Sequence, residues 1–195
     1  MKKEICLASN NEGKLLEFRD ILSPLGYVVY SPKDLNIDFD PIEDGKDYRE
    51  NAYIKAKDLF DKVKFDVISD DSGLEIKDLG NFPGLHTARY LKEQGSLKAV
   101  LEDLDRRLPK DSKREATFHC CLCLLEKGKD KPLYFEGECP GYLLKEEKGE
   151  NGFGYDPIFH SYEKDLDFGT ARKAEKGRVS HRGKALYRLA FYLSI

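Results

Sequence analysis

The residues of this sequence best suited to chemistry begin with two adjacent carboxylates. Asp70 and Asp71 follow a strand predicted over Asp66–Ser69, and Ser72-Gly73 comes next. Neighbouring carboxylates repel each other unless a cation or hydrogen-bond donors compensate. The pattern therefore indicates a cation site, although a tight turn rich in Asp and Gly would also explain it.

Charged residues upstream favour the cation site. An acidic loop over Asp38–Asp47 carries Glu43, and the helix predicted over Tyr48–Phe60 carries Asn51 and Lys55 on one face. Magnesium prefers oxygen ligands and is usually held by one or two carboxylates together with waters and substrate phosphates. We interpret these segments as parts of a site for magnesium and an anionic substrate.

A polar loop near the start of the chain could bind phosphate. Ser9–Gly13 joins a predicted strand, Glu4–Ala8, to a helix predicted over Lys14–Leu22. Free backbone N–H groups and the partial positive charge at a helix N-terminus favour phosphate, and Lys14 adds a full charge. A plain N-cap followed by a solvated lysine explains the loop equally well, and the Walker A pattern is absent.

Aromatic and basic residues late in the chain could bind a flat ring. Gly152-Phe153-Gly154 sets an aromatic ring between glycines, and stacking a base on such a ring contributes roughly 1–3 kcal/mol. Lys176 and Ser180-His181-Arg182 supply donors at the start of a helix predicted over His181–Leu193. There are two alternatives to base binding. The aromatic residue could simply fill the core, and the charged residues could lie at a helix start without binding a ligand.

The overall pattern predicts an α/β protein with a mixed sheet. Strands alternate with helices, and a hairpin around Lys127–Lys131 adds antiparallel strands. The further predicted elements are strands over Val28–Ser31, Leu74–Ile76, Glu115–Leu125 and Leu133–Cys139, and a helix around 97–104. Because no repeat or linker interrupts the chain, residues 1–195 are expected to form a single domain.

Composition and charge exclude several functions. A net charge of −3 offers no basic stripe for a nucleic-acid backbone. No apolar stretch resembles a secretory signal or approaches the roughly 20 residues of a membrane span, so a cytoplasmic protein without membrane partners is expected. The five cysteines, three of them in His119-Cys120-Cys121-Leu122-Cys123, are interpreted as buried reduced thiols, because zinc would need a second ligand pair.

The order of the motifs resembles that of a known family. The chain contains in succession LASNNEGKLLEF, EDGKDYRENAYIKA, SDDSGLEI, FPGLHTARY, ATFHCCL, NGFGYDPIF and EKGRVSHRGKAL. In this order they resemble the inosine/xanthosine triphosphate pyrophosphatase family from Leu7 to the last predicted helix. The combination of SDDSGL with FPGLHTARY, GFGYDPIF and SHRGKAL is highly specific.

The resemblance implies a fold and a reaction. Members of that family share an elongated, two-lobed α/β fold around a long twisted mixed sheet flanked by helices. Their active site lies in the cleft between the lobes, and they are usually homodimers. They need Mg²⁺ and hydrolyse non-standard purine nucleoside triphosphates (ITP, dITP and XTP) to the monophosphate and pyrophosphate. This chain is therefore expected to be a nucleoside triphosphate pyrophosphatase that cleanses the nucleotide pool.

The resemblance also implies roles for individual residues. Asp71 would be the catalytic proton acceptor, activating water for attack on the α-phosphorus, and also a metal ligand. Glu43 would be the second metal ligand, with Asp44 as its alternative. The residues expected to bind substrate are Ser9, Asn10, Asn11, Glu12, Gly13, Lys14, Lys55, Ser72, Arg89, Phe153, Gly154, Tyr155, Asp156, Lys176, His181 and Arg182.

Base selectivity follows from the donors among these residues. Lys176, His181 and Arg182 would pair with the 6-oxygen of hypoxanthine or xanthine and leave the amino group of adenine unmatched. Guanine has the same oxygen, so these donors do not reject it. Two departures from the family pattern are Asn10, where glycine is frequent, and Thr170-Ala171, where many members carry an acidic residue. An enzyme of the same fold with another base preference and a non-catalytic nucleotide sensor are the alternative functions.

Overall fold

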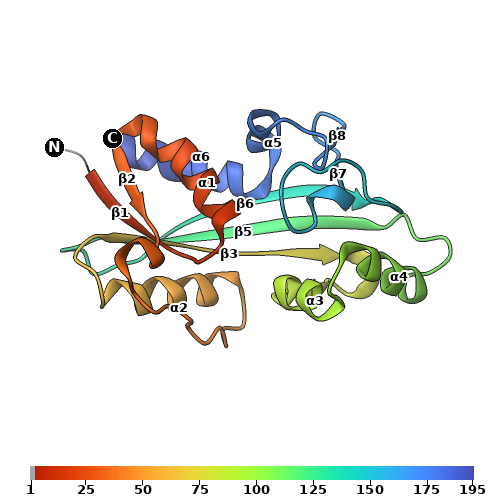
Figure 1. Ribbon diagram of the computed structural model, residues 1–195, viewed down its shortest axis with the longest axis horizontal. Helices are drawn as coiled ribbons and strands as arrows, with labels where there is room; N and C mark the ends of the chain where they lie inside the picture. The colour runs from red at the N-terminus through yellow and green to blue at the C-terminus, as the bar shows by residue number, and fades with distance from the viewer. Residues whose placement is uncertain (1–2) are drawn as a thin grey trace. The chain divides into compact units, whose positions relative to one another are not determined.

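A mixed β-sheet organises the chain, and the computed structural model describes residues 3–195 (Figure 1). The strand order is β2-β1-β3-β5-β6-β7-β8, with β4 paired to β3. Parallel pairs join β1 to β2 and β3, whereas β4, β7 and β8 pair antiparallel with their neighbours. The strands are β1 Lys3–Ala8, β2 Tyr27–Tyr30, β3 Asp66–Ile76, β4 Phe82–Gly84, β5 Glu115–Leu125, β6 Leu133–Leu143, β7 Phe159–Ser161 and β8 Leu166–Asp167. The predicted α/β class with a mixed sheet is confirmed.

Helices flank this sheet, and side chains at their first turns fix where two of them begin. The helices are α1 Glu12–Leu22, α2 Tyr48–Phe60, α3 Thr87–Gln94, α4 Leu97–Arg107, α5 Lys173–Val179 and α6 His181–Ser194, with 3-10 turns η1 Ser23–Leu25, η2 Lys33–Leu35, η3 Lys77–Leu79 and η4 Asp156–Ile158. Asn11 caps α1 by accepting from the Lys14 N–H, and Asp47 caps α2 by accepting from the Glu50 N–H. No helix in the described part of the chain is long and apolar enough to cross a membrane.

The chain divides into two compact units. Unit 1 comprises the described part of Met1–Asp71 with Cys120–Glu136 and Ala185–Ile195, and unit 2 comprises Ser72–His119 and Gly137–Lys184. The chain passes from one unit to the other inside β3, β5, β6 and α6. Asp71, the last residue of the first segment, is therefore followed directly in the sequence by Ser72 of unit 2.

Unit 1 has an apolar layer on each face of its strands. Ile5 and Leu7 pack with α1 and α6, whereas the alternate residues Cys6 and Ala8 pack with α2. Figure 1 shows α1 and α6 on one side of these strands and α2 on the other. Each face of β1 is thus covered by helices, and the five free cysteines of the whole chain are all buried, as predicted.

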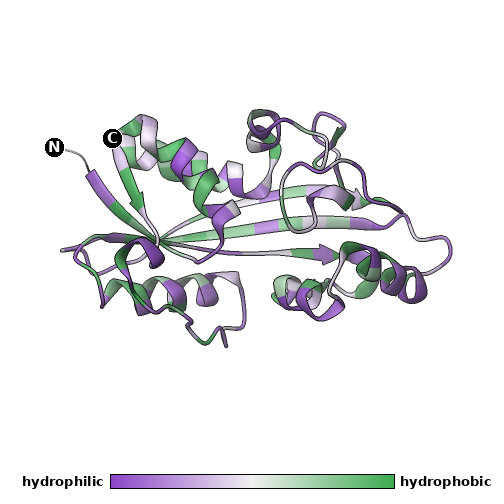
Figure 2. Cartoon of the chain, in the orientation of Figure 1, coloured by the Kyte–Doolittle hydropathy of each residue, from purple (hydrophilic) through white to green (hydrophobic). Residues whose placement is uncertain are grey.

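Unit 2 has a separate core beneath α3 and α4. In α4 the buried Val100 and Leu104 alternate at helical spacing with the exposed Lys98 and Glu102, a pattern seen as mixed green and purple along this helix in Figure 2. The same cluster of buried residues includes Leu74 and Ile76 of β3, Phe118 of β5 and Phe159 of β7. This core carries the loops described below.

One sequence prediction about β3 is wrong. Separate strands were predicted over Asp66–Ser69 and Leu74–Ile76, with residues 70–73 between them, but β3 runs without a break from Asp66 to Ile76. Its first part pairs with β1 as far as Ser69, and its last part pairs with β4 from Leu74. Partner strands at both ends and burial along the segment override the local preference of Asp, Ser and Gly for a turn.

Candidate active site

Unit 1 contains a carboxylate–lysine cluster, formed by Lys14, Glu43, Lys55, Asp70 and Asp71. The Lys55 Nζ donates to Asp71 Oδ1 at 2.5 Å and to Glu43 Oε2 at 2.9 Å. The Lys14 Nζ lies 2.5 Å from Asp70 Oδ1 and also donates to the Asp70 carbonyl at 3.2 Å. Each adjacent aspartate is therefore compensated by its own lysine, as the repulsion between them requires.

Hydrogen bonds between the acidic loop and α2 bring Glu43 to Lys55. Asn51 accepts from the Gly45 N–H at 2.9 Å, and it lies one helical turn before Lys55. A Cβ on Gly45 would lie 2.7 Å from Asn51 Oδ1 and 2.8 Å from the Asn51 nitrogen, so this close approach needs glycine. The Oδ1 of Asn51, a residue that shares a helical face with Lys55, thus holds the acidic loop against α2.

The charges in this cluster are set by burial and by ion pairing together. The pKa of Asp71 is raised to about 6. Burial is the main cause of this rise, and it outweighs the lowering of the pKa by Lys55 and Lys14. Burial also opposes ionisation of Glu43, but the charge and hydrogen bond of Lys55 leave the pKa of Glu43 below its ordinary value. The pKa of Lys55 is raised by Asp71 and Glu43 despite burial. A carboxylate with a pKa near 6 is suited to accept a proton near neutral pH.

The donor set of the cluster fits a magnesium ion. Glu43 and Asp71 both direct a carboxylate oxygen at one cationic group, the Lys55 ammonium, so their oxygens converge. Within residues 3–195 no group of three or more His, Cys, Asp or Glu side chains is placed to hold a metal. Magnesium here would therefore take its other ligands from water and from substrate phosphates, as it commonly does in proteins.

The loop over Ser9–Lys14 is braced by its own polar side chains. Ser9 Oγ accepts from the Asn11 N–H at 3.2 Å, and Asn10 Nδ2 donates to the Phe39 carbonyl at 2.8 Å. Glu12 is exposed and pairs at 3.7 Å with an exposed lysine, Lys33. Gly13 is half-buried in the first turn of α1. Asn10, which departs from the family pattern, therefore anchors this loop to Phe39 of the acidic loop.

Unit 2 contains an aromatic–cation cluster, formed by Ser72, Phe153, Asp156, Lys176 and Arg182. Asp156 Oδ2 accepts from the Lys176 Nζ and from the Phe153 N–H, both at 2.7 Å. The Phe153 ring centroid lies 4.9 Å from the Lys176 Nζ and 5.4 Å from the Arg182 Cζ. Arg182 Nη2 donates to Ser72 Oγ at 2.9 Å. A half-buried aromatic ring is thus flanked by two cations.

Glycine and tyrosine shape the loop that carries Phe153. Gly152 has a φ of +79°, and a Cβ there would lie 2.1 Å from Asp156 Oδ2, so the turn needs glycine. Gly154 has a φ of +62°. Tyr155 is buried, and its hydroxyl donates to the Thr87 carbonyl at 3.0 Å. Within unit 2, Tyr155 therefore anchors the loop to the start of α3.

The remaining predicted site residues, His181, Arg89 and Asp44, differ in burial. His181 is buried at the start of α6, whereas Arg89 is exposed on α3 and joins neither cluster through a bond in the described chain. Asp44 is exposed, while Glu43 pairs with Lys55. Asp70 belongs to the carboxylate–lysine cluster although the family resemblance gave it no role. The signal for it was its position beside Asp71.

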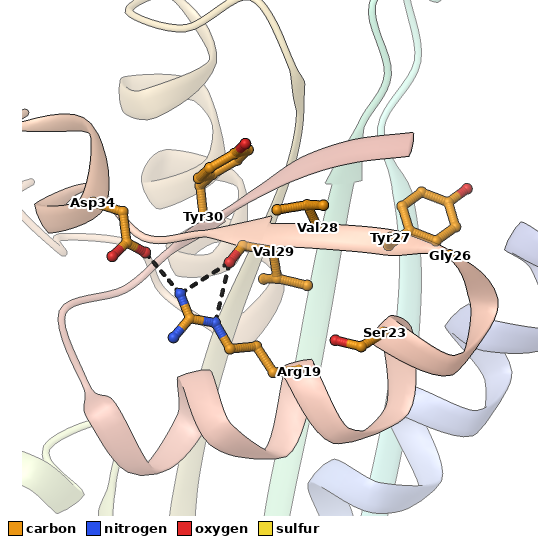
Figure 3. Close-up of a pocket in the computed structure, with 8 residues that line it drawn as sticks. All are labelled: Arg19, Ser23, Gly26, Tyr27, Val28, Val29, Tyr30 and Asp34. Atoms are coloured by element: carbon orange, nitrogen blue, oxygen red, sulfur yellow. Dashed lines mark hydrogen bonds and ion pairs between the residues drawn. The ribbon is translucent and has the colours of Figure 1, made fainter. Parts of the chain in front are cut away.

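A pocket elsewhere in unit 1 contains none of the predicted site residues (Figure 3). It lies against β2, and the Arg19 side chain crosses it to donate to the Val29 carbonyl at 3.1 and 3.2 Å and to Asp34 at 2.8 Å. The lining residues are Arg19, Ser23, Gly26, Tyr27, Val28, Val29, Tyr30 and Asp34. The Arg19 cation and the Asp34 carboxylate in this pocket neutralise each other, and Arg19 holds β2.

Comparisons with known proteins agree with the sequence resemblance. Residues 5–192 match the model of the Ham1 family. The chain is 42% identical over 189 residues to the dITP/XTP pyrophosphatase of Haemophilus influenzae, covering 95% of this chain and 96% of that protein. It is 39% identical over 190 residues to the dITP/XTP pyrophosphatase of Bacillus subtilis, covering 96% of each.

Solved structures give the same result for the fold. The Staphylococcus aureus Ham1 protein superposes with a TM-score of 0.84 at 37% identity, covering 98% of each chain. A structure from Mycobacterium abscessus described as a nucleoside-triphosphatase and dITP/XTP pyrophosphatase superposes with a TM-score of 0.72 at 31% identity, covering 95% of this chain and 97% of that one.

Proposed function

Because this chain belongs to the Ham1 family, we propose that it hydrolyses non-standard purine nucleoside triphosphates such as dITP and XTP. The products are the nucleoside monophosphate and pyrophosphate, and the class of enzyme is a nucleoside triphosphate pyrophosphatase. The observation that carries the proposal is the contact of one buried lysine, Lys55, with both Glu43 and Asp71. A sensor that only binds nucleotide has no need of such a buried proton acceptor.

Asp71 is the proton acceptor in the proposed reaction. It takes a proton from a water molecule, whose oxygen forms a bond to the α-phosphorus. The bond between the α-phosphorus and its bridging oxygen breaks, and pyrophosphate leaves with the electron pair. Lys14 and Lys55 balance the charge on the leaving group. Magnesium, which Glu43 and Asp71 would hold, would withdraw negative charge from the phosphates.

The aromatic–cation cluster is proposed to bind the base. Phe153 offers a ring face for stacking, and Lys176 and His181 supply donors for an oxygen at position 6 of the purine. Asp156 holds the Lys176 ammonium at 2.7 Å, which fixes the direction of its remaining N–H groups. Adenine would present an amino group to these donors and leave them unmatched, a penalty that is large in a buried site.

The test is magnesium-dependent pyrophosphate release from dITP and XTP beside dATP and dGTP. We expect strong release from the first pair, none when magnesium is chelated, and little from Asp71→Asn. Equal release from all four nucleotides would leave the chemistry standing but overturn the proposed base selectivity. Absence of release from every nucleotide would favour the sensor. The homodimer is a separate proposal, which the molar mass from light scattering will decide.

A further inference from the structure

The imidazole of His181 is stacked on an aromatic ring to which neither the reaction nor the family motifs give a role. The rings of His181 and Phe118 lie with centroids 4.5 Å apart and planes 9° from parallel. The two residues are 5% and 6% exposed, so the stack is closed to solvent. Because the nitrogens of an imidazole lie in its ring plane, the plane of Phe118 determines the directions in which His181 can bond.

Phe118 is itself held firmly within the core of unit 2. It lies on β5, its ring centroid is 4.6 Å from that of Phe159, and its plane is 7° from that of Phe168 at 6.4 Å. Phe159 and Phe168 are fully buried. The same Phe168 ring lies 5.7 Å from the Lys176 Nζ. Phe168 is therefore a neighbour of both Phe118 and Lys176, whereas only Phe118 stacks on His181.

The backbone of His181 is fixed independently of its ring. Ser180 Oγ accepts from the Gly183 N–H at 3.0 Å, at the junction between α5 and α6. A Cβ on Gly183 would lie 1.8 Å from the Gly177 carbonyl, so the two helices meet too closely for any other residue. With the main chain fixed by this junction, the stack on Phe118 supplies the remaining constraint, the orientation of the ring.

We propose that Phe118 is a positioning residue that orients His181 toward the 6-oxygen of the purine and so contributes to base selectivity. This role rests on the proposed function, because it requires that His181 contacts the base. Phe118 acts only through His181. Replacing its flat ring with an aliphatic side chain keeps the core apolar but removes the surface that sets the imidazole plane.

The test compares ITP with purine riboside triphosphate, which has hydrogen in place of the 6-oxygen. We expect Phe118→Leu to lower kcat/KM for ITP about tenfold, mainly through KM, because one neutral hydrogen bond to the base is misaligned. The value for purine riboside triphosphate should stay unchanged, and Phe118→Tyr should restore selectivity. Phe18→Leu, a matched change in the core of unit 1, should leave the ratio of the two substrates unaltered.

A double-mutant cycle and a spectrum complete the test. In a His181→Ala background, Phe118→Leu should have no further effect on ITP. In the wild-type protein, the imidazole C–H proton signals lost in His181→Ala should lie upfield because of the Phe118 ring current. Equal losses for both substrates, additive effects in the cycle or unshifted signals would each overturn the role of Phe118 while ITP hydrolysis stands. Absence of ITP hydrolysis by the wild-type protein would overturn both proposals.

Discussion

The Lys55 ammonium lies 2.5 Å from Asp71 Oδ1, and both side chains are buried. Burial raises the pKa of Asp71, and the charge and hydrogen bond of Lys55 oppose this rise. The pair thus places the carboxylate where it can gain and lose a proton in the physiological range. A nearby lysine is one of the standard means of setting the pKa of a catalytic group.

The first prediction concerns the pH dependence of hydrolysis. As the pH falls through about 6, the pKa of Asp71, the carboxylate gains a proton and can no longer accept one, so kcat/KM for ITP should fall. Lys55→Met removes the charge that lowers this pKa. The acid limb should therefore move to higher pH, in addition to an overall loss of rate. The measurement is the pH profile of kcat/KM for both proteins.

The substrate provides an internal control for this profile. Its terminal phosphate also titrates, but that titration is the same for wild-type protein and variant. Only the difference between the two profiles therefore reports on Asp71. Identical acid limbs in the two proteins would show that the carboxylate does not set the limb.

The second prediction concerns Thr87, whose side chain links the start of α3 to β3 through a hydrogen bond. Its Oγ1 accepts from the Leu74 N–H at 2.8 Å and donates to the Gly84 carbonyl at 2.6 Å. Thr87→Val keeps the volume but leaves a buried N–H without its partner, which should cost about 1–3 kcal/mol of unfolding free energy. Urea denaturation measures the loss, and Thr87→Ser should retain most of the stability. Equal stability of Thr87→Val and wild type would contradict the assignment.

The sequence predicts helices well where they have a cap and an apolar face. The bounds predicted for α2, Tyr48–Phe60, are those observed, because Asp47 caps its first turn and Ala52 and Ala56 mark its buried face. By contrast, α3 was not predicted. Its N-cap, His86, makes no side-chain capping bond, so the sequence carries no start signal there.

The short strands were also not predicted from the sequence. β4, β7 and β8 have only two or three residues each, too few to show an alternating pattern. The segment 81–84 has the composition of a turn, yet its residues Phe82–Gly84 pair with Leu74–Ile76. Such short strands form because they pair with a neighbouring strand, and the local sequence does not show which strand that is.

The candidate site was predicted from the order of its motifs more than from local chemistry. Lys14, Lys55 and Asp71 could be assigned because their motifs occur together in one family. The stack of Phe118 on His181 could not be assigned, because a phenylalanine in a strand is ordinarily a core residue and its partner lies 63 positions away in the chain. Only the packing of unit 2 brings the two rings together.

The third prediction concerns Asp34, whose carboxylate accepts hydrogen bonds from Ser31, the residue that follows β2. Its Oδ2 accepts from the Ser31 N–H at 2.8 Å, from the Ser31 hydroxyl at 2.9 Å and from Arg19 at 2.8 Å. These contacts, led by the backbone bond from Ser31, hold the pKa of Asp34 below its ordinary value. The stabilisation is therefore present above the unfolded-state pKa, roughly 3.9, and is lost as the pH falls through the lower folded-state pKa.

Asp34→Asn measures this contribution. Near pH 7 we expect it to lower the unfolding free energy by no more than about 1 kcal/mol, since the carboxylate is partly exposed and screened by water. The difference from wild type should shrink in urea titrations at acid pH, below the folded-state pKa of Asp34. A difference that is independent of pH would show that the charge of Asp34 contributes nothing.

The fourth prediction concerns the cysteine thiols. Burial raises the pKa of Cys6, Cys121 and Cys123 to about 12 and that of Cys139 to about 11. The thiolate is the reactive form, and the fraction ionised near pH 8 is then below about one in a thousand. The native protein should therefore react with a disulfide reagent such as dithionitrobenzoate only as fast as it unfolds, whereas in denaturant all five cysteines should react at once. Rapid labelling of the folded protein at constant pH, with the reactive residue located by mass spectrometry, would show that this thiol is reached by local opening of the sheet and not protected by the core.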